Sequence, residues 1–131
     1  NANYLRKQLE GVLPMPFDTA TLHEVVFNDE GLPNEIQTGD VAKRLIDYGF
    51  HPPTVYFPIH VKGALMIEPT ETESIEELDR FIAAVGAIRT EAEHDPERLK
   101  LAPHTTPVSR VDEVSAARNL DLRWLPDPEL A

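Results

Sequence analysis

The stretch Ala64-Leu-Met-Ile-Glu-Pro-Thr-Glu-Thr-Glu-Ser74 decides the fold, together with the residues that follow it as far as Glu93. Ala64 to Ile67 is a short apolar run that predicts a strand. Ser74, with Glu77 three positions later, matches the capping-box pattern that begins a helix. Apolar residues then recur at helical spacing, at Ile75, Leu78, Phe81, Ile82, Val85 and Ile88. The segment therefore predicts a strand followed by a helix that buries one face, and Asp95-Pro96 ends that helix.

Shorter elements are predicted on either side of this segment. Thr54–Phe57 should pair with Ala64–Ile67 as an antiparallel hairpin, because Lys62 and Gly63 have turn character. The remaining predicted elements are a helix over Asn1–Glu10, a strand over Leu22–Phe27, a helix from Thr38 or Asp40 to Tyr48, and a short helix over Val111–Arg118. Helices and short strands are thus interleaved, without a long parallel-sheet run. We expect an α+β fold in which helices cover a small antiparallel sheet.

Composition narrows the possible functions. The 131 residues suit one domain, and 23 acidic against 12 basic residues give a formal net charge of −11. This charge, without a Lys/Arg cluster, disfavours nucleic acid and anionic membranes as partners. It fits an acidic soluble surface better than adaptation to salt. The chain has no cysteine, so it has no disulfide or thiolate site, which fits a reducing cytoplasm.

The ends of the sequence lead to further expectations. The apolar runs are far shorter than the roughly 20 residues that span a bilayer. Asn1–Lys7 lacks an initiator Met and resembles the middle of a helix, so we expect the chain to be part of a longer one. We expect the tail from Asn119 to Ala131 to be irregular, with Trp124 as a possible anchor.

Two proline-stiffened loops carry the candidate site. Proline fixes the backbone, and loops held on a rigid scaffold are where functional side chains concentrate. The candidates are His51, Thr54, Glu68, Thr70 and Glu71. Each also has a structural interpretation: His51 as a turn histidine, Thr54 as the start of a strand, and Glu68 as an exposed carboxylate. For Thr70 and Glu71 we favour the structural interpretation, as turn formers that lead to the Ser74 cap.

Other polar residues are less informative. His23-Glu24, at the start of a strand, is a further candidate, with a structural role favoured. His104 and Thr105 form a loop pair that suggests domain–domain packing rather than catalysis, and Arg44 and Arg80 suggest solvated helix faces. His23-Glu24 lacks the second histidine of a zincin, and the spacing of the five histidines favours no metal site. The chain has no P-loop and no Gly-x-Ser-x-Gly elbow. The residues alone therefore predict an accessory domain with two polar loops.

A family resemblance adds to this interpretation. Asp40–Thr54, Leu65–Ser74 and Ala102–Thr105 resemble the C-terminal part of glycine decarboxylase, the pyridoxal-phosphate P-protein of the glycine cleavage system. Further segments are similar to the same family, in order, from Asn1 to Trp124: Asn1–Leu5, His23-Glu24 and Leu78-Asp79-x-Phe81. The ending Leu122-Arg123-Trp124 looks most like subunit 2 of the split form, whereas Leu125–Ala131 departs from the family.

The resemblance implies a specific role. It implies the small C-terminal domain of a fold-type I enzyme that decarboxylates glycine on pyridoxal phosphate and passes the aminomethyl group to the lipoyl H-protein. The family's Schiff-base lysine lies in a His-Lys-Thr segment, and none of the four lysines here (Lys7, Lys43, Lys62, Lys100) has that setting. This chain alone should therefore be inactive. The implied partners are the upstream large domain of the same polypeptide, the other P-protein subunit and the H-protein.

The implied domain boundaries place residues 1–12 at the end of a helix joining the upstream domain. Residues 13–118 then form the α+β small domain, and residues 119–131 the irregular tail. Two alternatives stay open: a non-catalytic interaction module that docks to an aminotransferase-like partner, and the small domain of another fold-type I pyridoxal-phosphate enzyme.

Overall fold

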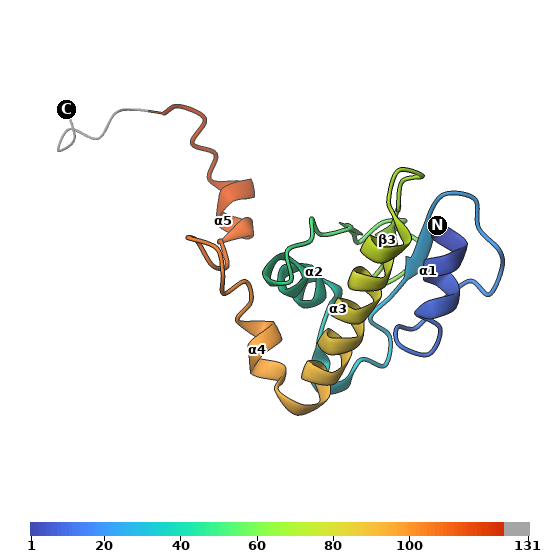
Figure 1. The fold of residues 1–131 in the computed structure, drawn as a ribbon. Coiled ribbons are helices and arrows are strands. Elements are labelled where there is room, and N and C mark those ends of the chain that lie inside the picture. Colours follow the sequence, from blue (N-terminus) through green and yellow to red (C-terminus); the bar gives the residue numbers. More distant parts are fainter. Residues whose placement is uncertain (125–131) are drawn as a thin grey trace.

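The apolar strand and the capped helix both form (Figure 1), and buried side chains of both belong to one hydrophobic core. The structure is a computed structural model that describes residues 1–124. Strand β3 (Leu65–Ile67) is the middle strand of a three-stranded sheet of order β1-β3-β2, with β1 at Val25–Phe27 and β2 at Thr54–Val55. Helix α3 spans Ile75–His94. The predicted α+β class is confirmed.

Both neighbours pair with β3 in antiparallel register. Val25 lies opposite Ile67 in one pair, and Thr54 opposite Met66 in the other, which confirms the predicted hairpin. The outer strands are shorter than predicted. Leu22 is 93% exposed and precedes β1, while Tyr56 has a positive φ of 58° that ends β2. A left-handed residue cannot continue the extended backbone of a strand.

The remaining helices are α1 (Ala2–Gln8), the 3-10 helix η1 (Pro33–Glu35), α2 (Thr38–Asp47), α4 (Pro96–Lys100) and α5 (Glu113–Arg118). The sequence predicted α1, α2 and α5 but neither η1 nor α4. Asp95-Pro96 does end α3, as predicted. The same proline also occupies the first position of α4, where its missing N–H and fixed φ favour a helix start.

The core lies between the sheet and helices α1, α2 and α3. Leu5 and Leu9 from the α1 region, Phe27 from β1, and Leu45 from α2 are all almost fully buried in it. The predicted apolar face of α3 is buried through Leu78, Phe81, Val85 and Ile88, with Ile82 partly buried. Ile75 is 50% exposed, so its prediction as a core residue was wrong. As the first residue of α3, it lies beyond the end of the buried stripe.

The capping box predicted for α3 is only half present. The Ser74 hydroxyl accepts from the Glu77 N–H at 3.2 Å. The Glu77 carboxylate accepts from Arg80 instead of completing the box. At α2, the Asp40 carboxylate accepts from the Gln37 N–H at 2.9 Å. Both helices therefore begin with acceptors for their free N–H groups.

Arg44 lies in the interior, so its prediction as a solvated residue was wrong. It is 5% exposed, and two of its nitrogens donate to the carboxylate of Glu91 on α3 at 2.8 and 2.9 Å. A further nitrogen donates to Asp47 at 2.9 Å. A guanidinium can be buried in this way because carboxylates neutralise it. Arg80 is exposed, as predicted.

The last described residues project from the body of the domain (Figure 1). Trp124 is 85% exposed and so anchors nothing within residues 1–124. Of the predicted irregular tail Asn119–Ala131, residues 119–124 form no helix or strand, and residues 125–131 lie outside the described part of the chain. None of the helices described here combines the length and the apolarity needed to cross a bilayer.

Candidate functional site

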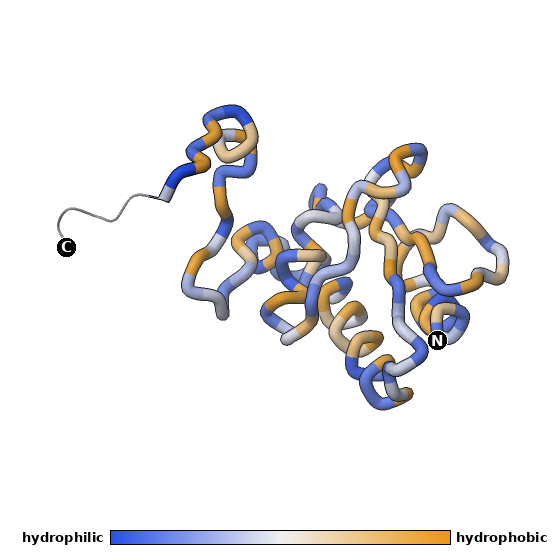
Figure 2. Tube along the Cα trace, turned by 90° about the horizontal axis from the view of Figure 1, so that it is seen from above, coloured by the Kyte–Doolittle hydropathy of each residue, from blue (hydrophilic) through white to orange (hydrophobic). Residues whose placement is uncertain are grey.

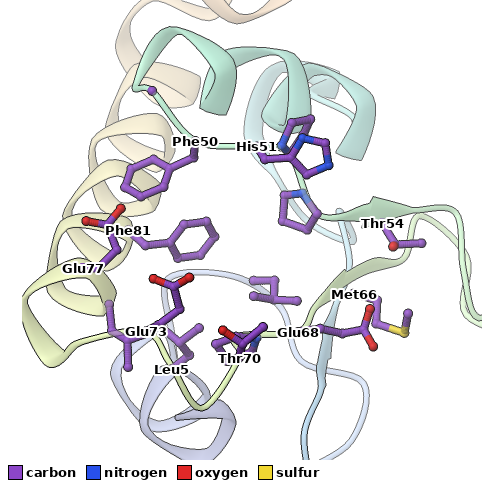
Figure 3. Close-up of a pocket in the computed structure, with 16 residues that line it drawn as sticks. Leu5, Phe50, His51, Thr54, Met66, Glu68, Thr70, Glu73, Glu77 and Phe81 are labelled. Atoms are coloured by element: carbon purple, nitrogen blue, oxygen red, sulfur yellow. The ribbon is translucent and has the colours of Figure 1, made fainter.

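The two loops singled out in the sequence form the walls of one pocket (Figure 3). The pocket has a volume of about 530 Å³ and lies between the loop after α2, the end of β3 and the first turns of α3. His51, Thr54, Glu68 and Thr70 line it. Of the predicted candidates, Glu71 and His23 do not line it.

The loop that carries His51 is fixed at its start. Gly49, with φ of 84°, follows α2 in the left-handed conformation that ends many helices, and the Phe50 N–H donates to the Leu45 carbonyl at 3.1 Å. The Phe50 ring meets the Phe81 ring of α3 edge-on, with the centroids 5.3 Å apart. This pair holds the loop against α3 and leaves His51 exposed on the pocket rim.

The opposite wall is a turn that leads into α3. The Glu73 N–H donates to the Thr70 carbonyl at 3.2 Å, and the hydroxyls of Thr70 and Thr72 lie 2.7 Å apart. The Asn1 side chain donates to the carbonyls of Thr70 and Glu73, at 2.7 and 3.2 Å. These bonds support the favoured interpretation of Thr70 as a turn former. In Figure 3, Glu68, Thr70 and Glu73 lie across the pocket from Phe50 and His51.

The lining is acidic. Glu68, Glu73 and Glu77 all line the pocket, and none of its lining residues is lysine or arginine. The guanidinium of Arg80 lies 5.5 Å from the Phe50 ring centroid and donates to Glu77, just outside the lining. Carboxylates concentrated in a cleft attract cations and repel phosphate. The pocket therefore suits an ammonium or guanidinium group. Sequence reasoning missed Glu73 and Glu77, because both lie at a helix start where acidic residues are common for capping.

His23 lies beside the pocket in a second polar group. Its imidazole and the carboxylates of Glu24 and Glu68 each offer a ligand atom, all within 4.8 Å of one another. The Nε2 atom of His23 is 3.8 Å from an oxygen of Glu24. Pairing of β1 with β3 brings Glu68 to this pair, so spacing along the chain could not predict the group. One imidazole and two carboxylates can hold a divalent cation, and a protonated imidazole can equally form an ion pair with them.

His104 and Thr105 belong to a different cluster, on α2. Their backbone N–H groups donate to one oxygen of Asp47 at 2.6 and 2.8 Å, and the Thr105 hydroxyl donates to it at 2.9 Å. Tyr48 donates to Glu91 at 2.9 Å, and its pKa is raised by burial and by this carboxylate. The cluster packs the C-terminal loop onto α2 of the same domain, whereas the sequence suggested packing between domains for His104 and Thr105.

The amino-acid sequence of this chain is similar to those of known proteins. A family model described as the C-terminal domain of glycine dehydrogenase matches residues 1–107. The chain is 55% identical, over 95% of its length, to a probable glycine dehydrogenase (decarboxylating) subunit 2 of Caldanaerobacter subterraneus subsp. tengcongensis. It is 50% identical, over 97% of its length, to a protein of the same description from Desulforamulus reducens. It is 51% identical, over 96% of its length, to one from Methylococcus capsulatus. The matches cover 26–27% of these relatives, so the chain spans about a quarter of their length.

Proposed function

The chain belongs to the family of glycine dehydrogenase C-terminal domains, and from this premise we propose that it works as part of subunit 2 of a split glycine dehydrogenase (decarboxylating). The complete enzyme would decarboxylate glycine with pyridoxal phosphate and pass the aminomethyl group to the lipoyl H-protein. Its partners would be the upstream region of the same polypeptide, which residues 1–12 would join, and the other subunit. We place the enzyme in the cytoplasm.

The pocket of this chain does not fit pyridoxal phosphate by itself. Its lining includes no lysine that could bond to the cofactor's aldehyde and no arginine that could bind its phosphate. The three lining carboxylates, Glu68, Glu73 and Glu77, oppose that phosphate. The cofactor and its lysine therefore belong to the part of the enzyme outside this chain.

The role left for this domain is one wall of the active site. The observation that carries this proposal is the convergence of His51, Thr54 and Glu68 on one pocket that nothing within residues 1–124 closes. His51 and Thr54 would supply hydrogen bonds to whatever lies opposite. The acidic lining would hold a positively charged group, such as the ammonium of an amino acid substrate or a basic side chain of the upstream region.

Replacing His51 in the complete two-subunit enzyme tests this role. His51→Ala should lower the rate of glycine decarboxylation or of glycine–bicarbonate exchange about 10- to 100-fold, the value of one hydrogen bond to a charged group. The melting temperature of the enzyme should stay unchanged, because His51 is exposed and no described hydrogen bond involves it.

His94→Ala is the matched control. His94 is also an exposed histidine, but it lies at the last residue of α3, whereas the pocket is lined by the first turns of that helix. Its replacement should leave the rate within about twofold, as expected for a surface residue. Equal losses of rate and stability in His51→Ala would show that His51 is structural and would overturn the proposed role.

A further inference from the structure

The acidic wall of the pocket is a short turn, residues 68–73, that links β3 to α3. Every residue of this wall turn is hydrophilic, whereas β3 before it is hydrophobic (Figure 2). All of its residues except Pro69 are exposed. Glu68, Glu71 and Glu73 lie within these six residues, and carboxylates so close together repel one another. The shape of the wall turn therefore depends on hydrogen bonds rather than on apolar burial.

A side chain from the other end of the sequence holds the wall turn. The Nδ2 atom of Asn1 donates to the carbonyls of Thr70 at 2.7 Å and of Glu73 at 3.2 Å, which lie 69 and 72 positions later. The remaining bonds of the turn are its own, from the Glu73 N–H to the Thr70 carbonyl and between the hydroxyls of Thr70 and Thr72. Among residues 1–124, Asn1 is thus the only distant residue that forms a hydrogen bond with the wall turn.

The chemistry of these two bonds requires an amide. Both partners of Asn1 are carbonyl oxygens, which only accept, so the NH₂ group of the amide and not its oxygen must face them. The two hydrogens of that group match the two carbonyls. The Asn1 side chain forms no capping hydrogen bond with α1, although it stands at the N-cap position of that helix. Its contacts therefore serve the wall turn and not its own helix.

Helix α1 gives Asn1 a fixed base beside the pocket. Leu5, one helical turn after Asn1, is 1% exposed and lines the pocket. The Tyr4 hydroxyl donates to the carboxylate of Asp79 on α3 at 2.5 Å, which ties the two helices together. Figure 3 shows Leu5 on the same side of the pocket as Thr70. The amide of Asn1 is therefore held in place by buried and hydrogen-bonded neighbours, and it can impose a position on an exposed turn.

The neutrality of this contact preserves the charge of the wall. Within residues 1–124, no lysine or arginine forms an ion pair with Glu68 or Glu73. A lysine or arginine in place of Asn1 could also donate to the turn, but its charge would attract and neutralise these carboxylates. The amide binds backbone carbonyls instead. It fixes the wall turn and leaves the negative charge of the pocket available to a cation.

We propose that Asn1 is a positioning residue for the substrate side of the pocket. Its amide holds the wall turn so that the carboxylates of Glu68 and Glu73 meet the ammonium group of an amino acid substrate. Asn1 itself touches no reacting group and acts through the turn. This inference rests on the proposed function, because it requires an amino acid substrate in the pocket of the complete enzyme.

Asn1→Asp in the complete two-subunit enzyme is the test. Aspartate keeps the size of asparagine but replaces the two N–H donors with an oxygen that repels the carbonyls of Thr70 and Glu73. The KM for glycine in glycine–bicarbonate exchange should rise about 10-fold, the value of a hydrogen bond or two, with kcat changed less than about threefold. Hydrogen exchange of peptides covering residues 68–74, measured by mass spectrometry, should become about 10-fold faster.

Asn3→Asp is the matched control, because it makes the same substitution and adds the same charge in the same turn of α1. The Asn3 side chain bonds to a different loop: it donates to the Thr21 carbonyl at 2.6 Å and accepts from the Thr21 N–H at 3.0 Å. This variant should leave the KM and the exchange of residues 68–74 within about twofold of the unaltered enzyme. Asn1→Gln keeps the amide, so its KM should stay within about threefold.

Three results would overturn the proposal. Unchanged hydrogen exchange of residues 68–74 in Asn1→Asp would show that Asn1 does not hold the wall turn. Faster exchange with an unchanged KM would show that the turn does not position the substrate. An equal rise of KM in Asn3→Asp would assign the effect to the added charge and not to the lost donors. If the unaltered enzyme does not act on glycine, the proposed function is wrong, and the exchange measurement still decides whether Asn1 holds the turn.

Discussion

The carboxylate of Asp47 joins helix α2 to the C-terminal loop. It accepts from Arg44 at 2.9 Å, from the N–H groups of His104 and Thr105, and from the Thr105 hydroxyl. Burial alone would raise the pKa of Asp47, but the N–H groups of Thr105 and His104, the Arg44 guanidinium and the Thr105 hydroxyl together lower it to about 2. The charged form is therefore the one that the folded protein stabilises.

This lowered pKa makes the free energy of unfolding depend on pH in the acidic range. A carboxyl group with a lowered folded-state pKa stabilises the protein above its unfolded-state pKa, here 3.8, and loses that contribution as the pH falls to about 2. The contribution amounts to about 2 kcal/mol. We expect the free energy of unfolding, measured with urea, to fall between pH 4 and pH 2. Asp47→Asn should lower stability at pH 7 and reduce that fall.

Asp18→Asn is the control for this titration. Asp18 also pairs with an arginine, Arg6, at 3.2 Å, but its side chain is 88% exposed. Exposed pairs contribute roughly 0–1 kcal/mol, so this variant should keep both the stability and its acid dependence. If the free energy of unfolding of Asp47→Asn falls between pH 4 and pH 2 as much as that of the unaltered protein, other carboxylates cause the fall.

The position of a single residue could be predicted where it depends on neighbouring residues in the sequence. His51, Thr54, Glu68 and Thr70 could be selected because each stands in a proline-stiffened loop, and the structure brings all of them to one pocket. Arg44 could not be placed, because its partner Glu91 lies 47 positions away. A helix pattern shows which residues share a face but not which distant carboxylate will cover them.

At the scale of elements, Gly63 fixes the approach of the β3 hairpin to α2. It has φ of 63°, and a Cβ added there would lie 1.8 Å from an Asp29 oxygen. The same carboxylate accepts from the N–H of Thr38, the first residue of α2, at 2.9 Å, and the Thr38 hydroxyl donates to the Gly63 carbonyl. The glycine therefore leaves room for the side chain that caps α2.

Gly63→Ala should lower the free energy of unfolding by about 2 kcal/mol or more, through backbone strain and displacement of Asp29. Gly86→Ala is the matched control: Gly86 lies inside α3, with nothing within 4 Å of an added Cβ. That variant should gain about 0.5–1 kcal/mol, because alanine favours a helix more than glycine does. Urea unfolding of both variants gives the comparison. A neutral Gly63→Ala would mean that Asp29 does not cap α2 in solution.

The sequence predicted best those elements whose apolar residues recur regularly or are flanked by turn residues. The apolar stripe of α3 and the pairing of β2 with β3 depend on local periodicity and turn residues, and both are present. Helix α4 was missed because Pro96 was interpreted only as the end of α3. Strand lengths were overestimated, because the positive φ of Tyr56 depends on the loop that follows β2 and not on its own β-forming preference.

At the scale of the whole molecule, the proposed function assigns the cofactor and its lysine to the region upstream of this chain. Isolated residues 1–131 mixed with pyridoxal phosphate should therefore show no visible absorbance band of a lysine-bound cofactor and no decarboxylation of glycine. The complete subunit, which includes the upstream region, should show the band under the same conditions. A band from the isolated chain would mean that one of its own lysines binds the cofactor, and the assignment of the cofactor to the upstream region would be wrong.

The central position of β3 has a consequence for synthesis of the protein. The three residues Leu65–Ile67 pair with both β1 and β2, although β1 is translated about 40 positions earlier. On the ribosome, β1 and helix α1 emerge long before the strand that joins them to the sheet and the helix that covers them. Phe27 and Leu5 therefore cannot complete their native packing until α3 has left the exit tunnel, an interval in which a holding chaperone would have its clearest effect.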